Sequence, residues 1–451
     1  MSSTAATAST MARVGVEAKK RNSTAEIVAA SMGGTAIEFY DNYCYSIAAA
    51  SYFGLIFFTD VAKSDPVLAT LLSFVTFAVS FLARPFGSLL FGHFGDKLGR
   101  KKTLVVALML MGIATFVVGL LPGYEVLGPT SVVLLCVCRA CQGLGLGGEW
   151  SGAALVATEN APKNKRALYG SFPNMGAPIG FFCAYGVNLL LDSTLPADAM
   201  VAWGWRIPFW LALPLGYITH YIRTHLEDSP VYAQMQERMK EMGEKVEHPI
   251  RTLFTKHLRV LLISFGACVL NAVGFYAVLT YLPNYLQDTV GYDAGSSSLI
   301  TTICLVAYIA FIFLSGRISD KVGRKKMLII ACVGFIIFTV PAFYLLNSQN
   351  FAIILIVELV MCLLLTINDG TLASYLTETF PTDVRYSGFA LPFNLANAIF
   401  GGSASFISFW LIDLTGNAIA PAWYMVAISV VAFIAMCMTH DHSGKKLDDV
   451  K

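Results

Sequence analysis

The chain has 451 residues, of which 56% are hydrophobic and only 13% are charged. A soluble domain typically carries about 25% charged residues, so this composition excludes an ordinary water-soluble protein. Because the formal net charge is only +2, the positions of the charges carry more information than their sum.

Twelve apolar runs follow one another along the chain. Each is close to the roughly 20 residues that a helix needs to span a bilayer. The runs lie near residues 27–56, 66–92, 103–122, 131–157, 167–192, 203–222, 258–285, 296–316, 327–346, 351–374, 387–412 and 422–438. The pattern predicts an all-α membrane protein with twelve transmembrane helices.

Lys and Arg lie on one side of these runs if the runs alternate across a bilayer, and the opposite loops contribute Lys63. By the positive-inside rule we expect both termini and the central loop to be cytoplasmic. The expected organisation is a disordered tail, a six-helix bundle, a charged linker, a second six-helix bundle and a short tail. Their bounds are residues 1–24, 25–222, 223–257, 258–438 and 439–451.

The first apolar run contains two carboxylates, Glu38 and Asp41. Residues three apart share one face of a helix, and a rise of 1.5 Å per residue places both near the middle of the bilayer. Carboxylates are costly there, so an intramembrane one is a candidate functional group. A buried structural ion pair is the alternative.

Two arginines in other runs match these carboxylates in depth. By the same helical rise, Arg84 in the second run is level with Glu38, and Arg139 in the fourth run is level with Asp41. A guanidinium favours the carboxylate form whereas burial disfavours it, so a site that opens alternately to each side can bind and release a proton. We therefore expect Asp41 to carry a proton, Arg139 to tune it, and Glu38 with Arg84 to form an adjoining pair.

Residues 92–102 and 316–326 both spell G-x-x-x-D-K-x-G-R-K-K, half a chain apart. Each copy lies between two apolar runs, which predicts a tight basic loop between membrane helices. The acidic and basic residues of each loop can form a breakable ion-pair latch at the helix ends. These latch residues are Asp96 and Arg100 in the first copy and Asp320 and Arg324 in the second.

A second motif is also duplicated. An E-x-x-P string with Arg seven residues after the Glu occurs at Glu159 to Arg166 and again at Glu378 to Arg385. The two repeats together predict pseudo-symmetric halves, the parallel-repeat plan of many transporters. We expect these four residues to join the latch. We assign Glu149 to the inner latch with loop arginines such as Arg100, with a second titrating group as the alternative, and Asp369 to the latch around Arg324.

Polar side chains inside the apolar runs are candidates for substrate binding, because hydroxyls and amides orient a polar solute in a cavity. Each could equally serve helix packing. Besides Glu38, Arg84 and Arg139, the candidates are Tyr45, Gln142, Asn174, Asn271, Tyr276 and Asn394.

The duplicated loop resembles the signature loop of the major facilitator superfamily. The strings E-F-Y-D, G-L-G-L-G-G-E-W, A-P-K-N-K-R and W-G-W-R-I-P-F are similar to those of its metabolite:proton symporter family, over essentially the whole chain from the first to the twelfth run. The resemblance implies a bacterial inner-membrane importer of a small, usually carboxylate-bearing metabolite, with the major facilitator fold.

The expected function is therefore proton-coupled symport by alternating access. A symporter of a zwitterionic osmolyte such as proline or betaine is an alternative, and a partial glycine-proline motif in the fifth run keeps an efflux antiporter open. The ten cysteines lack metal spacing, and no nucleophile, cofactor or nucleotide motif appears. We expect a monomer, not an enzyme, that binds a small solute, a proton and the lipid bilayer, with no metal, no other cofactor and no nucleic acid.

Overall fold

The computed structural model describes residues 22–225, 228–243, 246 and 248–447. The expected disordered tail therefore lies almost entirely outside the described residues, as does the end of the C-terminal tail. Every regular element in the described ranges is helical.

The N half, residues 22–225, forms six long helices. The first is stabilised at its start by a capping box between Ser23 and Glu26. The long helices are α2 (Thr24–Ala48), α5 (Pro66–Leu98), α6 (Arg100–Val118), α8 (Pro129–Glu159), α9 (Arg166–Thr194) and α11 (Ile207–Thr224). A π turn, η1 (Ala49–Phe53), continues α2 into α3 (Gly54–Phe57), and the short elements α4 (Thr59–Ser64), α7 (Tyr124–Leu127), α10 (Ala197–Ala202) and η2 (Gly204–Arg206) lie in the connections.

The C half, residues 258–438, repeats this plan. Its long helices are α14 (Leu258–Tyr276), α16 (Ala294–Val322), α17 (Arg324–Leu346), α18 (Phe351–Thr379), α19 (Arg385–Ala396) and α21 (Ala420–Met438). α14 continues through η3 (Ala277–Tyr281), α15 (Leu282–Asn284) and η4 (Tyr285–Thr289), and α19 through η5 (Asn397–Gly401) into α20 (Ala404–Thr415). The linker between the halves contains α12 (Pro230–Glu241) and α13 (Pro249–Lys256).

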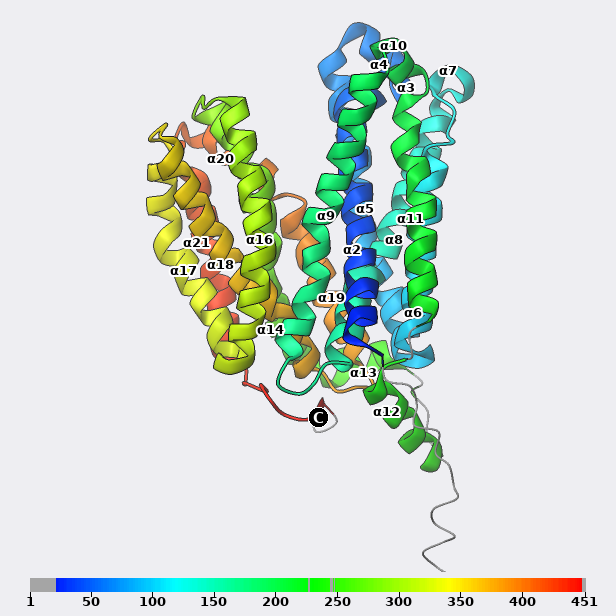
Figure 1. Ribbon diagram of the computed structural model, residues 1–451, viewed down its shortest axis with the longest axis vertical. Helices are drawn as coiled ribbons and strands as arrows, with labels where there is room; N and C mark the ends of the chain where they lie inside the picture. Colours follow the sequence, from blue (N-terminus) through cyan, green and yellow to red (C-terminus); the bar gives the residue numbers. More distant parts are fainter. Residues whose placement is uncertain (1–21, 226–227, 244–245, 247, 448–451) are drawn as a thin grey trace, which may run out of the picture.

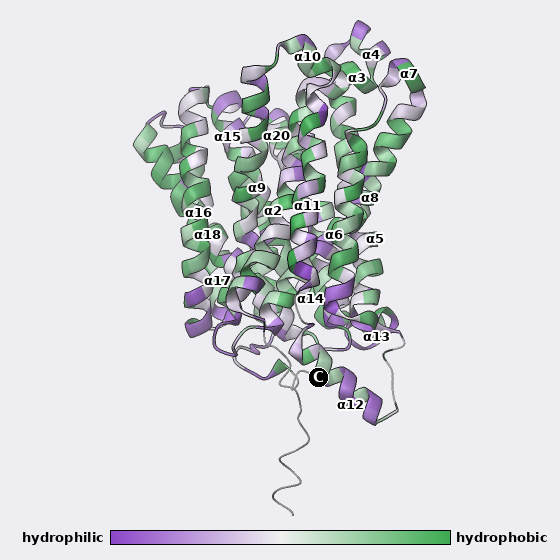
Figure 2. Cartoon of the chain, turned by 45° about the vertical axis from the view of Figure 1, so that its right-hand side comes forward, coloured by the Kyte–Doolittle hydropathy of each residue, from purple (hydrophilic) through white to green (hydrophobic). Residues whose placement is uncertain are grey.

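Ten helices of the described chain are long and apolar enough to cross a membrane. The remaining two long helices, α2 and α11, carry more polar residues but pack within the same six-helix bundle. This count agrees with the twelve runs expected from the sequence. Hydrophobic residues cover the flanks of the molecule, and hydrophilic ones gather at one end (Figure 2).

The duplicated basic segments are less loop-like than expected. α5 remains helical to Leu98 and α16 to Val322, so most of each predicted loop is helix. The chain reverses at single glycines, Gly99 with φ +112° and Gly323 with φ +103°. Glycine adopts positive φ angles without a steric penalty because it has no side chain. A single glycine can therefore make each turn.

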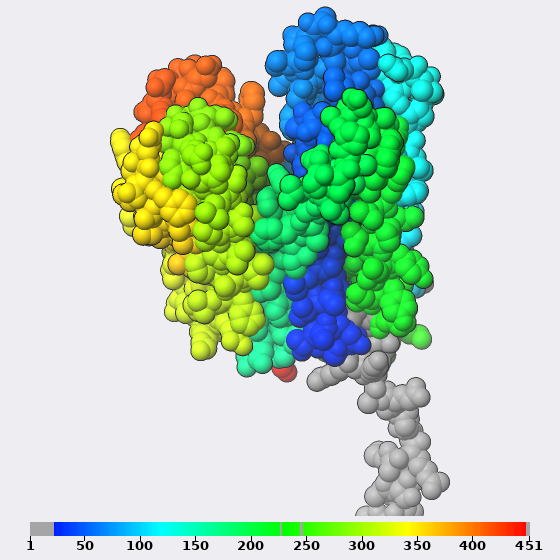
Figure 3. All heavy atoms as spheres, turned by 45° about the horizontal axis from the view of Figure 1, so that its top comes forward, coloured from blue at the N-terminus to red at the C-terminus, as the bar shows by residue number. Residues whose placement is uncertain are grey.

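The two halves meet at one end of the molecule and diverge at the other (Figure 1). We call the joined end, where the α5–α6 and α16–α17 turns and the linker lie, the base, and the opposite end the mouth. The halves touch through α9 against α16 and α18, and through α5 and α8 against α19. The space-filling surface is hollowed between the halves at the mouth (Figure 3). The two bundles are therefore joined at the base and separated at the mouth.

Glycines in α8 allow the neighbouring helices α5 and α6 to approach it closely. A side chain at Gly143 or Gly147 would collide with the α5 backbone, and one at Gly145 would lie 2.7 Å from the Ala107 carbonyl of α6. Small residues permit close contact between membrane helices. The glycine-rich string of the fourth run therefore lets α8 pack closely against α5 and α6.

Candidate substrate and proton site

A small cavity lies between the halves. Its volume is about 40 Å³, more than the roughly 10–15 Å³ that a water molecule requires. It is lined by residues of both halves: Glu38, Phe39, Arg84, Trp150 and Asn174 from the N half, and Asn271, Phe275, Tyr276, Asp369, Phe393 and Asn397 from the C half. A whole metabolite needs more room, so binding one requires the halves to separate at this level.

Glu38 and Arg84 form a loose ion pair in the cavity wall. Arg84 Nη2 lies 3.8 Å from Glu38 Oε1, and both side chains are about 5% exposed. The guanidinium also lies 4.5 Å from the centre of the Phe81 ring. Glu38 Oε2 and Arg84 Nε are buried without a hydrogen-bond partner among the described residues. A hydrogen bond between nitrogen and oxygen is normally 2.7–3.2 Å, so this pair has room to accept another group.

Asp41 belongs to a tighter network beside the cavity. Arg139 Nη1 lies 3.7 Å from Asp41 Oδ2 and donates to Gln142 Oε1 at 2.8 Å. Gln142 Nε2 donates to Asp41 Oδ1 at 2.8 Å and to Thr115 Oγ1 at 2.9 Å. Asp41, Arg139 and Gln142 are fully buried. Both expected pairs of carboxylate and guanidinium are therefore present, and only Glu38–Arg84 lines the cavity.

Tyr45 and Gln142, expected to bind substrate, lie outside the cavity wall. Tyr45 packs its ring 4.0 Å from the Arg139 guanidinium, shares a 2.6 Å hydrogen bond with Thr76, and joins an aromatic cluster near the mouth with Phe53. The rotation of each helix directs these side chains at neighbouring helices. They contact Arg139 and Asp41 and do not line the cavity.

Asp369 was assigned to the latch around Arg324, and the structure shows that this assignment is wrong. Its carboxylate lines the cavity, where it accepts hydrogen bonds from Asn271 at 2.5 Å and Tyr308 at 2.6 Å. α18 extends for ten further residues to Thr379, so Asp369 lies well inside the helix and not at its end.

The remaining amide and aromatic candidates have mixed roles. Asn174 accepts a hydrogen bond from Trp150 Nε1 at 2.7 Å and donates to the Asp369 carbonyl at 3.1 Å. Trp150 stacks on Phe393 with ring centres 3.8 Å apart. Asn394 donates to the Gly147 carbonyl of the other half at 2.9 Å and joins the halves below the cavity wall.

At the base, each signature-loop aspartate caps a helix of the opposite half. Asp96 accepts from the backbone N–H groups of Tyr386 and Ser387, at 2.8 and 2.9 Å, at the start of α19. Asp320 accepts from the N–H groups of Ala167 and Leu168, both at 3.0 Å, at the start of α9. The first N–H groups of a helix lack partners within it and attract negative charge. These aspartates therefore hold the halves together.

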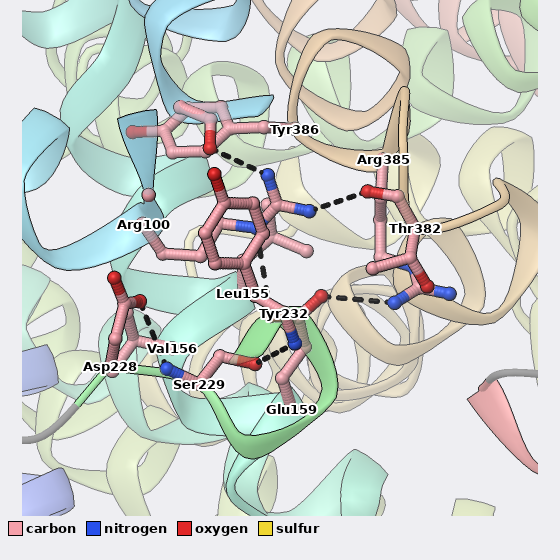
Figure 4. A network of polar contacts seen from close by, with 12 residues as sticks. Arg100, Leu155, Val156, Glu159, Asp228, Ser229, Tyr232, Thr382, Arg385 and Tyr386 are labelled. Atoms are coloured by element: carbon pink, nitrogen blue, oxygen red, sulfur yellow. Dashed lines mark hydrogen bonds and ion pairs between the residues drawn. The ribbon is translucent and has the colours of Figure 1, made fainter. Parts of the chain in front are cut away.

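Crossed ion pairs reinforce the closed base. Arg385 Nη1 lies 3.0 Å from Glu159 Oε1 (Figure 4), and Arg166 Nη1 lies 3.2 Å from Glu378 Oε1. In each pair the glutamate and the arginine come from opposite halves. Within each half, the loop arginine supports the same glutamate: Arg100 is 3.6 Å from Glu159 and Arg324 is 3.1 Å from Glu378. The expected latch residues of both repeats are thus brought together.

Two segments cross the base from outside. After the N half, Tyr232 packs its ring 4.8 Å from the Arg100 guanidinium (Figure 4), and burial raises the pKa of its phenol to about 12, so the ring is neutral. After the C half, the carbonyls of Lys445 and Leu447 accept from Arg166 at 2.7 Å and from Arg385 at 2.8 Å. The linker and the C-terminal tail therefore both contact arginines of the base.

Glu149 has a different partner from the expected loop arginine. Arg223, at the end of α11, contacts its carboxylate at 2.5 and 2.7 Å and donates to the Ala30 carbonyl at 3.0 and 3.2 Å. All three residues belong to the N half. Glu149 is therefore part of a structural pair that ties α8, α11 and α2 together, and Arg100 is engaged with Asp96.

Residues 32–402 match the model of the Major Facilitator Superfamily. The chain belongs to the Major Facilitator Superfamily. It is 41% identical to the inner membrane metabolite transport protein YhjE of Escherichia coli, over 94% of this chain and 96% of that one. It is 34% identical to the proline/betaine transporter of Escherichia coli, over 90% of this chain and 81% of that one.

The fold agrees with this membership. The structure of the proton:xylose symporter XylE bound to 6-bromo-6-deoxy-D-glucose aligns with a TM-score of 0.76 at 20% identity, covering 94% of this chain and 97% of that one. This facilitator is therefore a multi-pass membrane transporter of small molecules and not an enzyme, and the expected superfamily and twelve-helix fold are confirmed.

Several residues of this facilitator's site and base were not predicted. Trp150 appeared only within a motif, and Arg223 only as the first residue of the linker. Arg223 directly follows an apolar run. Its position at the end of a membrane span could have indicated that it pairs with a buried acidic residue. The contacts of Lys445 and Leu447 use main-chain carbonyls, which every residue has. The pattern of side chains in the sequence could therefore not have identified these contacts.

Proposed function

We propose that this facilitator is a proton-coupled symporter that imports a small carboxylate-bearing metabolite by alternating access. The observation that carries the proposal is the pair of carboxylate–guanidinium contacts, 3.8 Å for Glu38–Arg84 in the cavity wall and 3.7 Å for Asp41–Arg139 beside it. Each places a carboxylate next to a guanidinium at a distance that a proton or a solute carboxylate can alter. The proton is the only coupling ion or cofactor in this proposal.

Arg84 is the group best placed to bind the solute. It lines the cavity, its Nε has no partner among the described residues, and a guanidinium can grip a carboxylate with two hydrogen bonds. A solute carboxylate that binds Arg84 competes with Glu38, which then favours a proton. Arg139 and the Gln142 amide favour the carboxylate form of Asp41, and movement of α2 relative to α8 allows Asp41 to be protonated.

With a closed base and an open mouth, the structure corresponds to the outward-facing state if both termini are cytoplasmic, as the distribution of Lys and Arg indicates. In this proposal the transporter acts as a monomer in a bacterial inner membrane. The solute enters from the mouth, and release requires the latch at the base to open. A relative named as an inner membrane transport protein supports this location.

A zwitterionic osmolyte is the second candidate, because the cavity offers a place for a cation. Trp150, Phe275 and Phe393 face the same space as Asp369, and aromatic faces near a carboxylate suit a quaternary ammonium group. Arg84 on the opposite wall would bind the carboxylate of such a solute. Relatives named as proline/betaine transporters agree with this chemistry.

The test is transport in proteoliposomes containing the purified protein. A thermal-shift screen with 2-oxoglutarate, shikimate, proline and glycine betaine first selects the solute, because a ligand stabilises the state that it binds. Accumulation of that labelled solute should follow an imposed pH gradient that is acidic outside and collapse with a protonophore. Accumulation that ignores the pH gradient contradicts proton coupling, and export of the solute in exchange for protons indicates the antiporter.

The Asp41→Asn variant tests the assigned proton carrier. Exchange of labelled for unlabelled solute should survive, because exchange needs no net proton movement, whereas uptake driven by pH should fall at least about tenfold, equivalent to 1.4 kcal/mol. Asp413→Asn, the same chemical change at an exposed position of α20, is the matched control. Full pH-driven uptake by the Asp41→Asn protein would remove Asp41 from the mechanism.

A further inference from the structure

Asp369 occupies the cavity wall of the C half, opposite the Glu38–Arg84 pair. It lies on α18, is 1% exposed, and lines the same cavity as Arg84. The carboxylate has no latch function, because its partners come from α14 and α16 of the same half. Its place in the cavity therefore requires a separate explanation.

No cationic side chain of the described residues pairs with Asp369. α16 presents Tyr308 to it and α14 presents Asn271, while Trp150 of α8 and Asn174 of α9, which line the same cavity, are neutral. On α18 itself the nearest titratable group along this face is Cys362, while Glu38 and Arg84 across the cavity pair with each other. A buried carboxylate without a cation is unfavourable, so Asp369 needs a proton or a cationic ligand.

The hydrogen bonds of Asp369 fit both of its protonation states. Asn271 donates to Oδ1, and the carbonyl oxygen of a protonated acid accepts that bond equally well. The Tyr308 hydroxyl donates to Oδ2 now and can accept when Oδ2 carries the proton, because a hydroxyl is both donor and acceptor. Asp41, in contrast, faces the guanidinium of Arg139, which only donates and favours the ionised form.

We infer that Asp369, with Tyr308 and Asn271, is a second proton-binding site, in the C half, which loads from the hollow at the mouth. This inference rests on the proposed function for its role in transport. The proton adds to Asp369 Oδ2 to form an O–H bond that donates to the Tyr308 oxygen, and the same bond breaks on release.

The site is linked to the movement of the halves. Asn174 of α9 donates to the main-chain carbonyl of Asp369 at 3.1 Å across the boundary between the halves, and Trp150 positions Asn174. Separation of α9 from α18 at the base removes that contact and gives Asp369 a path to the other side. Loading at one side and release at the other therefore follow from one motion.

The first experiment needs no substrate. Infrared difference spectra of the purified protein between acidic and alkaline buffer report the carbonyl stretch of protonated carboxyl groups. Asp369→Asn should remove one component of that band, and Tyr308→Phe should shift the same component without removing it, because it loses one hydrogen bond. Asp413→Asn is the exposed control. An Asp369→Asn spectrum identical to the wild-type spectrum in this region would overturn the inference.

The second experiment counts protons. With glycine betaine and 2-oxoglutarate as probes in proteoliposomes that contain a pH-sensitive dye, Asp369→Asn should carry fewer protons per transported solute molecule than the wild type. An unchanged proton count contradicts the inference. If the wild type accumulates neither probe in response to pH, the proposed function fails, and the infrared result still decides whether Asp369 binds a proton.

Discussion

The two halves of this transporter treat buried carboxylates differently inside the membrane. In the N half each one lies beside a guanidinium, and in the C half neither does. The N-half pairs are Glu38 with Arg84, Asp41 with Arg139 and Glu149 with Arg223. In the C half, Asp369 has only neutral donors, and Glu358 has a thiol contact from Cys304 at 3.8 Å, with Oε1 lacking a partner among the described residues.

The two halves therefore repeat the same contacts at the base, but they have different contacts around the cavity. At the base, Asp96 and Asp320 cap equivalent helices and Glu159 and Glu378 form equivalent crossed pairs. The closing contacts serve both halves in the same way. At the centre, an N half with paired charges faces a C half with neutral donors, so the two walls of the cavity differ.

The largest effect should come from breaking an N-half pair. Arg223→Met leaves Glu149 buried without a cation, and losing one partner of a buried pair costs about 3–5 kcal/mol. We expect a clear fall in the thermal unfolding midpoint of the detergent-purified protein. The double variant Glu149→Gln with Arg223→Met should recover most of the loss, because no unpaired charge remains.

A matched C-half variant completes that comparison. Asp369→Asn removes a carboxylate that has no cationic partner, so its unfolding midpoint should stay within a few degrees of the wild type. Equal destabilisation by Arg223→Met and Asp369→Asn would show that the halves do not differ in how they stabilise buried charge.

A smaller, symmetric effect is expected at the base. Glu159→Gln and Glu378→Gln each weaken a hydrogen-bonded charge pair between the halves, worth about 1.5–3 kcal/mol. The population with an open base should rise at least about tenfold in both. Spin-label distances between position 163, in the connection from α8 to α9, and position 321, at the base end of α16, report this opening.

The spin-label experiment uses a background in which the two exposed cysteines, Cys183 and Cys437, are serine. Glu125→Gln, which changes a carboxylate in the short helix α7 away from the base, is the control. A strong opening in only one of the two latch variants would mean that the repeated ion pairs are not equivalent.

The smallest effect should come from the C-terminal tail. Removal of residues 439–451 takes away the carbonyls that accept from Arg166 and Arg385, and a typical hydrogen bond contributes about 0.5–1.5 kcal/mol. The same spin labels should show a modest increase in base opening. Lys445→Ala should change nothing, since the contact uses the main chain, and an effect of that variant as large as truncation would refute this account.

Much of the fold followed from the sequence. The twelve runs agree with the twelve long helices, and the helical rise placed Arg84 level with Glu38 and Arg139 level with Asp41 before any contact was known. The duplicated motifs correctly indicated which residues meet at the base. The roles of these residues in proton and solute transport stay predictions.

Tertiary structure decided the rest, for a physical reason. Hydropathy and helical rise fix how deep a residue lies, but they do not fix the rotation of its helix or the neighbour across from it. For this reason the sequence did not indicate that Asp369 lines the cavity, that Glu149 pairs with Arg223, or that Tyr45 is hydrogen-bonded to Thr76. The sequence by itself determined a membrane transporter with two related halves and charges at its centre, and only the packing of those halves decided which charges are paired and which face the cavity.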